Sequence, residues 1–124
     1  MKNLILFIFP FFLFQSCEPC LSGSELDSKI NECYSTSFSQ TKTQIATGVV
    51  KVTFNNTCND LPMTITKVGI KFKPYAGMGE TAVKTKKDKF LVSPGSSIIR
   101  EYNLDVGDKV INAYAYRNSI QFCE

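Results

Sequence analysis

The segment IATGVVKVTF (Ile45 to Phe54) indicates the class of fold. Every second position in it is apolar or small, namely Ala46, Gly48, Val50, Val52 and Phe54. The side chains between them are more polar and include Lys51 and Thr53. Because successive side chains of a strand point to opposite faces, this period of two predicts a strand with one face in a core. The residues from Asn55 to Asp60 then predict a turn.

The same alternation continues along the chain. Val68, Ile70 and Phe72 share one side of the next predicted strand, which ends at Pro74. Further strands are predicted at residues 90–92, 97–104, 109–116 and 119–123, with turn residues between them. About six or seven short strands with turn signals roughly every 8–12 residues are typical of an all-β sandwich. We therefore expect an immunoglobulin-like antiparallel β-sandwich, on strand number and size alone, preceded by a short helix over about 24–32.

The N-terminal segment has the layout of an export signal. Lys2 and Asn3 precede eleven apolar residues, from Leu4 to Phe14. A membrane-spanning helix needs about 20 apolar residues, so this run is too short to span. A charged start before an apolar core of about 7–15 residues is typical of a secretory signal. We predict that residues 1–16 are a signal peptide.

Export makes the cysteines informative, because disulfides form in oxidising compartments. The chain has five cysteines, namely Cys17, Cys20, Cys33, Cys58 and Cys123. An odd number in an exported protein requires an explanation. The segment Phe14-Gln15-Ser16-Cys17 resembles a bacterial lipoprotein signal, with Ser16 and Cys17 matching the pattern and Phe14 and Gln15 in place of its usual Leu and small residue. In such proteins a diacylglyceryl group is attached to the cysteine thiol, and a peptidase cuts just before it.

The resemblance implies an organisation and a location. Residues 17–24 would be a lipidated cysteine and a tether, with Ser22-Gly23-Ser24 as its flexible part. Residues 25–124 would be the β-sandwich. The protein would be held in the bacterial cell envelope, outside the cytoplasm, by lipid on Cys17.

The other four cysteines are disulfide candidates, and four cysteines permit three pairings. In the expected topology the start of the first strand and the end of the second lie at the same end of the sandwich. Cys33 and Cys58 could then meet, which leaves Cys20 with Cys123. This pairing is preferred and the other two stay open. Each bridge would contribute roughly 3–4 kcal/mol by restricting the unfolded chain.

Two other interpretations of Cys17-Glu18-Pro19-Cys20 are less favoured. Cys-x-Pro-Cys resembles the redox motif of the thioredoxin family, but that motif follows a strand in a βαβ unit. A zinc site needs a second close pair of ligands, which the chain lacks. The chain has no histidine, which removes the commonest general base. We expect no enzyme activity, no metal and no cofactor.

Charge and aromatic residues indicate candidate surfaces. Without residues 1–16 the formal charges are 13 positive and 11 negative, a net of +2, which by itself favours neither nucleic acid nor an acidic ligand as a partner. Lys84, Lys86, Lys87 and Lys89 form a charge run, which is interpreted either as a contact for anionic lipid or acidic glycan or, preferably, as protection of an edge strand. Tyr102, Tyr114 and Tyr116 would form an exposed patch if they shared a sheet face, although aromatic residues in strands usually pack.

The function predicted from the sequence is that of a lipid-anchored envelope protein. Its β-sandwich would bind a protein or glycan partner in the envelope or have a structural role, and nucleic acid is not expected as a partner. The alternative is a soluble secreted inhibitor or toxin-neutralising module.

Overall fold

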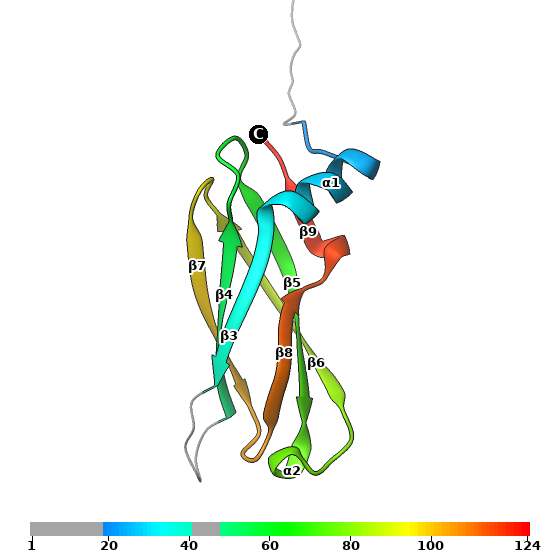
Figure 1. The fold of residues 1–124 in the computed structure, drawn as a ribbon, viewed down its shortest axis with the longest axis vertical. Helices are drawn as coiled ribbons and strands as arrows, with labels where there is room; N and C mark the ends of the chain where they lie inside the picture. The colour runs from blue at the N-terminus through cyan, green and yellow to red at the C-terminus, as the bar shows by residue number, and fades with distance from the viewer. Residues whose placement is uncertain (1–18, 41–47) are drawn as a thin grey trace, which may run out of the picture.

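The structure is a computed structural model that describes residues 19–40 and 48–124. Its described residues form two helices, a short 3-10 helix and seven strands (Figure 1). In chain order these are α1 (Gly23–Cys33), β3 (Tyr34–Gln40), β4 (Gly48–Asn56), β5 (Met63–Lys73), α2 (Pro74–Gly77), β6 (Ala82–Val92), β7 (Ser97–Leu104), β8 (Lys109–Ala115), η1 (Arg117–Ser119) and β9 (Ile120–Phe122). The predicted signal peptide, Cys17 and residues 45–47 of the first predicted strand lie outside the described residues.

The strands form two antiparallel sheets, which face each other in Figure 1. One sheet has the order β3-β4-β7 and the other has the order β6-β5-β8. β9 continues along the same side of β5 as β8, because β8 pairs with residues 68–73 and β9 pairs with residues 63–65. The all-β sandwich expected from the sequence is confirmed, and its finer immunoglobulin-like arrangement stays a prediction.

The core lies between the two sheets. On β4 the side chains of Val50, Val52 and Phe54 are fully buried, which confirms the period of two from which the strand was predicted. They face the second sheet, where Ile65 and Ile70 of β5 are also fully buried. Burial of a side chain of this size contributes about 1.5–3 kcal/mol. The core therefore accounts for the alternation in both strands.

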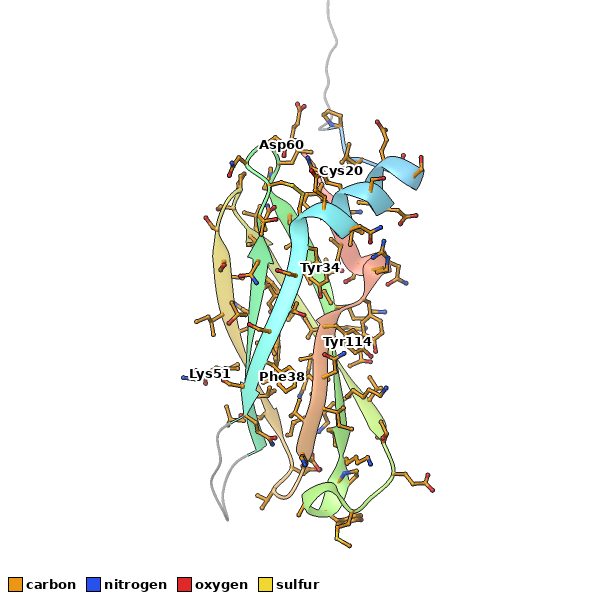
Figure 2. All side chains as sticks on the ribbon, viewed as in Figure 1. Cys20, Tyr34, Phe38, Lys51, Asp60 and Tyr114 are labelled. Atoms are coloured by element: carbon orange, nitrogen blue, oxygen red, sulfur yellow. A yellow bond between two sulfur atoms is a disulfide. The ribbon has the colours of Figure 1, made fainter. Side chains whose placement is uncertain are left out.

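Two disulfides lie at the end of the sandwich that carries α1, which we call the disulfide end (Figure 2). They join Cys20 to Cys123 and Cys33 to Cys58, and this is the preferred pairing of the sequence analysis.

The chain is already part of the fold at Cys20, which forms a β-bridge with Cys123. The backbone N–H of Leu21 donates to Phe122 O at 3.0 Å, and α1 begins at Gly23. The segment Ser22-Gly23-Ser24, predicted as a flexible tether, thus belongs to the folded unit. The folded unit begins before residue 25, because a disulfide and a backbone hydrogen bond hold this segment against β9.

β3 joins the two sheets through its side chains, although it was not among the predicted strands. The hydroxyl of Tyr34 accepts from the backbone N–H of Ala115 at 2.7 Å, and Thr36 Oγ1 donates to Ala113 O at 3.2 Å. The Gln40 amide donates to Asp108 O and accepts from the N–H of Val110. β8 is an edge strand with unpaired backbone groups. The side chains of β3 pair these groups in place of a neighbouring strand.

Candidate functional site

The alternation of side chains along β5 determines which of its residues lie on the outer face of the sheet β6-β5-β8. Val68 and Ile70 are fully buried against the other sheet. The residues between and beside them, which include Lys67, Gly69 and Lys71, therefore point away from the core. β5 contributes a row of lysines to this outer face, interrupted by one glycine.

The pairing of β5 with its neighbours brings further lysines to the same face. Lys87 of β6 lies opposite Lys67, and Lys109 of β8 lies opposite Lys73. Tyr114 lies opposite Gly69, and the N–H of Tyr116 donates to Lys67 O at 3.1 Å. We call this surface the lysine–tyrosine face, and it consists of Lys67, Lys71, Lys73, Lys87, Lys109, Tyr114 and Tyr116. Among the described residues, no aspartate or glutamate pairs across it.

The two tyrosines have defined positions at the centre of this face (Figure 2 labels Tyr114). The ring of Tyr114 lies across Gly69, and it makes an edge contact with Tyr116 at a centroid distance of 5.5 Å. The Tyr116 hydroxyl lies 2.8 Å from Thr85 Oγ1, and Lys67 Nζ lies 5.6 Å from the Tyr116 ring centroid. These contacts hold the rings in place while leaving both side chains partly exposed.

The electrostatics of the face follow from its composition. Burial and the neighbouring Tyr116 raise the pKa of Tyr114, so its phenol stays protonated at neutral pH. Five lysines surround the hydroxyls and aromatic rings, and among the described residues none of the five has an aspartate or glutamate as its cross-strand partner. Such a surface attracts anions and offers hydrogen-bond donors to them.

The outer face of the other sheet is different in kind. Its residues on β3 are serines, and those on β4 and β7 are mostly small or polar. Its cation Lys51 pairs with Glu101 across the strands, with an Nζ to Oε2 distance of 3.9 Å. The cationic excess of the described sheets is therefore concentrated on the lysine–tyrosine face.

The four lysines of the predicted charge run do not form one surface. All four lie on β6, an edge strand, as the protective interpretation requires. Lys84 and Lys86 pair with the buried Ile70 and Val68, so they point to the inner side of the sheet. Lys87 points outward, and Lys89 follows at an irregularity in the pairing of β6 with β5. Lys84 and Lys86 lie on the other side, because neighbours in a strand point to opposite sides, and Lys87 joins the lysine–tyrosine face because its register places it opposite Lys67.

Tyr102 is separate from the other two tyrosines, because it is buried between the sheets. Its hydroxyl donates to Asp88 Oδ2 at 2.8 Å, and Arg100 Nη2 donates to Asp88 Oδ1 at 2.7 Å. Burial works to raise the pKa of Asp88, but the hydrogen bonds from Arg100 and Tyr102 outweigh it and lower that pKa. This cluster links β6 to β7 and is part of the packing. The interpretation of three tyrosines as one exposed patch was wrong.

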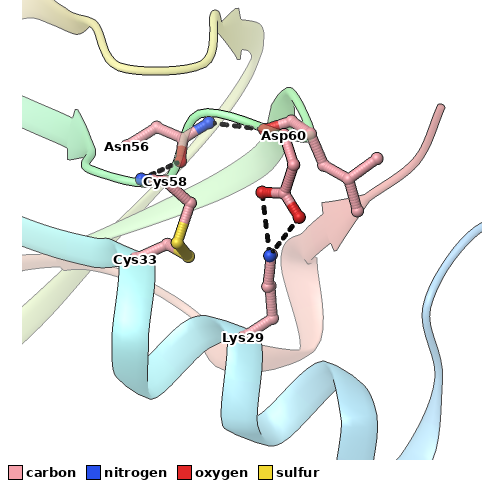
Figure 3. Close-up of polar contacts among 6 residues, drawn as sticks. Lys29, Cys33, Asn56, Cys58 and Asp60 are labelled. Carbon is pink, nitrogen blue, oxygen red and sulfur yellow. Dashed lines mark hydrogen bonds and ion pairs between the residues drawn. A yellow bond between two sulfur atoms is a disulfide. The ribbon is translucent and has the colours of Figure 1, made fainter.

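The disulfide end carries a different charge. Figure 3 shows Lys29 of α1 paired with Asp60, at 2.6 Å from Nζ to Oδ2, beside the Cys33–Cys58 bridge. Asn56 is buried here, and its amide donates to the carbonyl oxygens of Leu61 and Val92. The charged residues at this end are the carboxylates Glu25, Asp27, Glu32, Asp60 and Glu124 and the cations Lys29 and Arg117. The disulfide end is therefore acidic.

One group of potential metal ligands occurs among the described residues, and it lies at this end. Ligand atoms of Glu32, Cys33 and Cys58 lie within 4.8 Å of one another. Both sulfurs are joined in a disulfide, so neither is the thiolate that a metal requires. The Cys33–Cys58 disulfide therefore accounts for the short distances within this group.

The opposite end carries an exposed apolar tip. Tyr75, Met78 and Val106 are 79%, 86% and 61% exposed. The N–H of Ala76 donates to Gly107 O, which joins α2 to the turn between β7 and β8. The charges beside it are mixed, because Asp105 and Glu80 accompany the lysines. In that turn the Asp108 carboxylate accepts from the N–H of Asp105.

Comparisons with protein-family models, curated proteins and solved structures gave no match. None of the helices in the described part of the chain has the length and apolar character needed to cross a membrane. The candidate function therefore rests on the geometry and charge of the residues themselves.

Proposed function

We propose that this protein is a lipid-anchored protein of the bacterial cell envelope, attached through Cys17, that binds an anionic envelope partner on its lysine–tyrosine face. The single observation that carries the binding part is that five lysines and two tyrosines share this face, and that no aspartate or glutamate pairs across it in the part of the chain that the structure describes. The anchoring part is supported by the N-terminal sequence pattern and by two disulfides, which belong to an oxidising compartment.

The distance between anchor and fold supports this arrangement. Cys17 precedes the disulfide-bonded Cys20 by three residues, and three residues span at most about 10 Å. The disulfide end therefore stays close to the membrane surface. β5 starts near that end and runs to α2 (Figure 1), so the lysine–tyrosine face extends away from the membrane.

The charge distribution indicates which partner the lysines meet. The acidic disulfide end faces the headgroups of the anchoring membrane, and anionic lipids repel it at short range. Lys71, Lys73 and Lys109 lie toward the α2 end of the sheet. The cationic face is thus presented to material beyond the membrane surface.

Anchoring is tested by labelling growing cells with radioactive palmitate. The protein incorporates the label and stays with envelopes that are washed in high salt, which screens the lysine contacts, and Cys17→Ser loses both properties. Ser24→Ala, an exposed change on α1, is the control and keeps both. An unlabelled chain recovered from the medium would instead support the soluble secreted module.

Binding is tested separately with purified Cys17→Ser protein added to washed envelopes. The protein is retained, and Lys67→Gln/Lys71→Gln/Lys87→Gln reduces its retention. The control Lys51→Gln/Lys84→Gln/Lys86→Gln has the same net charge but lies off the face, and it is retained as well as the parent. Equal losses in the two triple variants would reject a specific role for this face.

A further inference from the structure

The arrangement of the residues on the lysine–tyrosine face indicates the chemical class of its partner. We infer that the face binds a linear acidic polysaccharide that lies along β5. This inference rests on the proposed function and names the ligand of the same face. It is carried by the charge of the face, by the order of residues along it and by its position relative to the anchor.

The order of residues along β5 fits an extended polymer. Lys67 and Lys73 are six residues apart, so about 20 Å separates them along the strand. Lys87 stands beside Lys67, and Lys109 stands beside Lys73. Cation pairs thus occupy both ends of the strip, with Lys71 between them. A chain with anionic groups at intervals would contact all of these lysines, whereas a single small anion would contact one pair.

The middle of the strip is suited to sugar rings. Tyr114 crosses the centre of the face over Gly69, and Tyr116 lies beside it. Tyrosine offers a large and rigid contact surface with an apolar body and a polar tip. A sugar ring is also apolar on its C–H faces and polar at its rim. Thr85 and Asn112 lie beside the rings and supply hydroxyl and amide groups that can bond sugar hydroxyls.

The position of the face argues against the other polyanions. Anionic lipid of the anchoring membrane lies at the acidic disulfide end, away from Lys71, Lys73 and Lys109. Nucleic acid is not a constituent of the envelope compartment in which the protein is proposed to reside. A polysaccharide with carboxylate or other acidic groups combines the charge that the lysines require with the rings that the tyrosines fit.

The test uses the protein purified with its anchor in a nonionic detergent, and calorimetric titration with polygalacturonate as the probe. Polygalacturonate binds and neutral dextran does not. The affinity falls about tenfold or more between roughly 50 and 200 mM salt, because several lysine contacts release counterions. Lys67→Gln/Lys71→Gln/Lys87→Gln weakens binding about tenfold or more. The control Lys51→Gln/Lys84→Gln/Lys86→Gln stays within about twofold of the parent, because these lysines lie off the face.

The tyrosine contribution is separated from charge by two neutral substitutions. Tyr114→Phe keeps the ring and retains binding within about threefold. Tyr114→Leu keeps an apolar side chain over Gly69 but removes the ring, and it weakens binding about fivefold or more. Circular dichroism and intact disulfides establish that each variant is folded. Equal binding by the Phe and Leu variants would overturn the role of the ring.

Two competitors, measured with the purified Cys17→Ser protein in the absence of detergent, decide the ligand class, because the anchored protein would enter vesicles through its acyl chains. Phosphatidylglycerol vesicles and a thymidine oligonucleotide bind at least tenfold more weakly than polygalacturonate if the inference holds. Comparable binding by either one would overturn it, because the face would then recognise charge alone. Failure of polygalacturonate to bind while envelopes still retain the protein through this face would reject the polysaccharide and leave the proposed function standing.

Discussion

The ring of Tyr114 occupies the space above Gly69, so that a Cβ atom at position 69 would lie 2.7 Å from Tyr114 Cε1. The two residues are direct partners across β5 and β8. The absence of a side chain at Gly69 is what allows the ring to cross the sheet at this point. One glycine therefore determines the position of the central aromatic group of the lysine–tyrosine face.

Gly69→Ala is expected to displace Tyr114 and to lower the free energy of unfolding by about 1 kcal/mol. In a Tyr114→Ala background the same substitution is neutral or stabilising, since alanine is better than glycine within a strand. Urea unfolding of the four proteins in this double-mutant cycle measures the difference, which is the coupling of the two positions. Additive effects would show that the ring does not depend on Gly69.

Asp88→Asn is expected to lower stability by about 1–2 kcal/mol at neutral pH, because it weakens the charged hydrogen bonds to Arg100 and Tyr102. The pKa of Asp88 is lowered in the folded protein. Its contribution is therefore present above the unfolded pKa of about 3.9 and is lost as the pH falls through the folded pKa. Urea midpoints of parent and variant should differ at pH 7 and converge near pH 2.

A matched control for Asp88 is Glu101→Gln on the neighbouring strand β7. Glu101 is exposed, and its distance from Lys51 is 3.9 Å, so its removal should change stability by less than about 0.5 kcal/mol. A pH-independent difference between Asp88→Asn and the parent would contradict the assignment of the effect to the charged form.

Ala76→Gly is expected to stabilise the protein by about 0.5–1 kcal/mol. Ala76 has φ 57 and ψ 31, a left-handed conformation that costs free energy for any residue with a Cβ. Ala82→Gly is the control, since Ala82 lies in β6 and glycine weakens a strand by a similar amount. Thermal unfolding should show shifts of opposite sign. A lower melting temperature for Ala76→Gly would contradict the prediction.

Replacing both cysteines of a bridge by alanine is expected to cost more for Cys20–Cys123 than for Cys33–Cys58. The bridged residues are 103 and 25 positions apart. The chain-entropy relation then gives about 4.7 and about 3.5 kcal/mol. Guanidinium unfolding of the two double variants measures which bridge contributes more to the free energy of unfolding. A larger loss for Cys33–Cys58 would indicate that native packing at α1 outweighs the entropy of loop closure.

The strand pattern was predictable where one face is buried and the other is polar. β4 and β7 have this pattern, and the strand predicted at residues 97–104 is β7 of the structure. The disulfide pairing was the preferred one of three, and the structure shows it to join the start of β3 to the end of β4. Local alternation was sufficient for β4 and β7, whereas the disulfide pairing stayed one of three possibilities until the position of β3 was known.

β3 was not predictable in the same way. Its sequence YSTSFSQ is mostly hydroxyl residues, and Phe38 is 37% exposed. The inward side chains Tyr34, Thr36 and Gln40 bond the edge of β8 instead of filling the core. A strand that is stabilised by hydrogen bonds to a distant edge has no apolar period, so the sequence alone does not indicate it.

The lysine–tyrosine face was missed for a related reason. Lys84, Lys86, Lys87 and Lys89 are neighbours in the chain and were predicted as one charge run, but alternation divides them between two sides of β6. Lys67, Lys71 and Lys73 do share one side of a predicted strand, and this signal was available. The addition of Lys87 and Lys109 depends on the pairing register, which no local pattern specifies.

The Cys20–Cys123 bridge has a mechanical consequence. Force applied to the N-terminal segment reaches the fold at Cys20, three residues after Cys17. Cys20 is bonded covalently to Cys123, the residue that follows β9. Tension entering there is carried directly to the opposite end of the polypeptide and cannot unzip α1 and β3 one hydrogen bond at a time. A fold in which Cys20 and Cys123 are joined in this way resists force that is applied through the segment before Cys20.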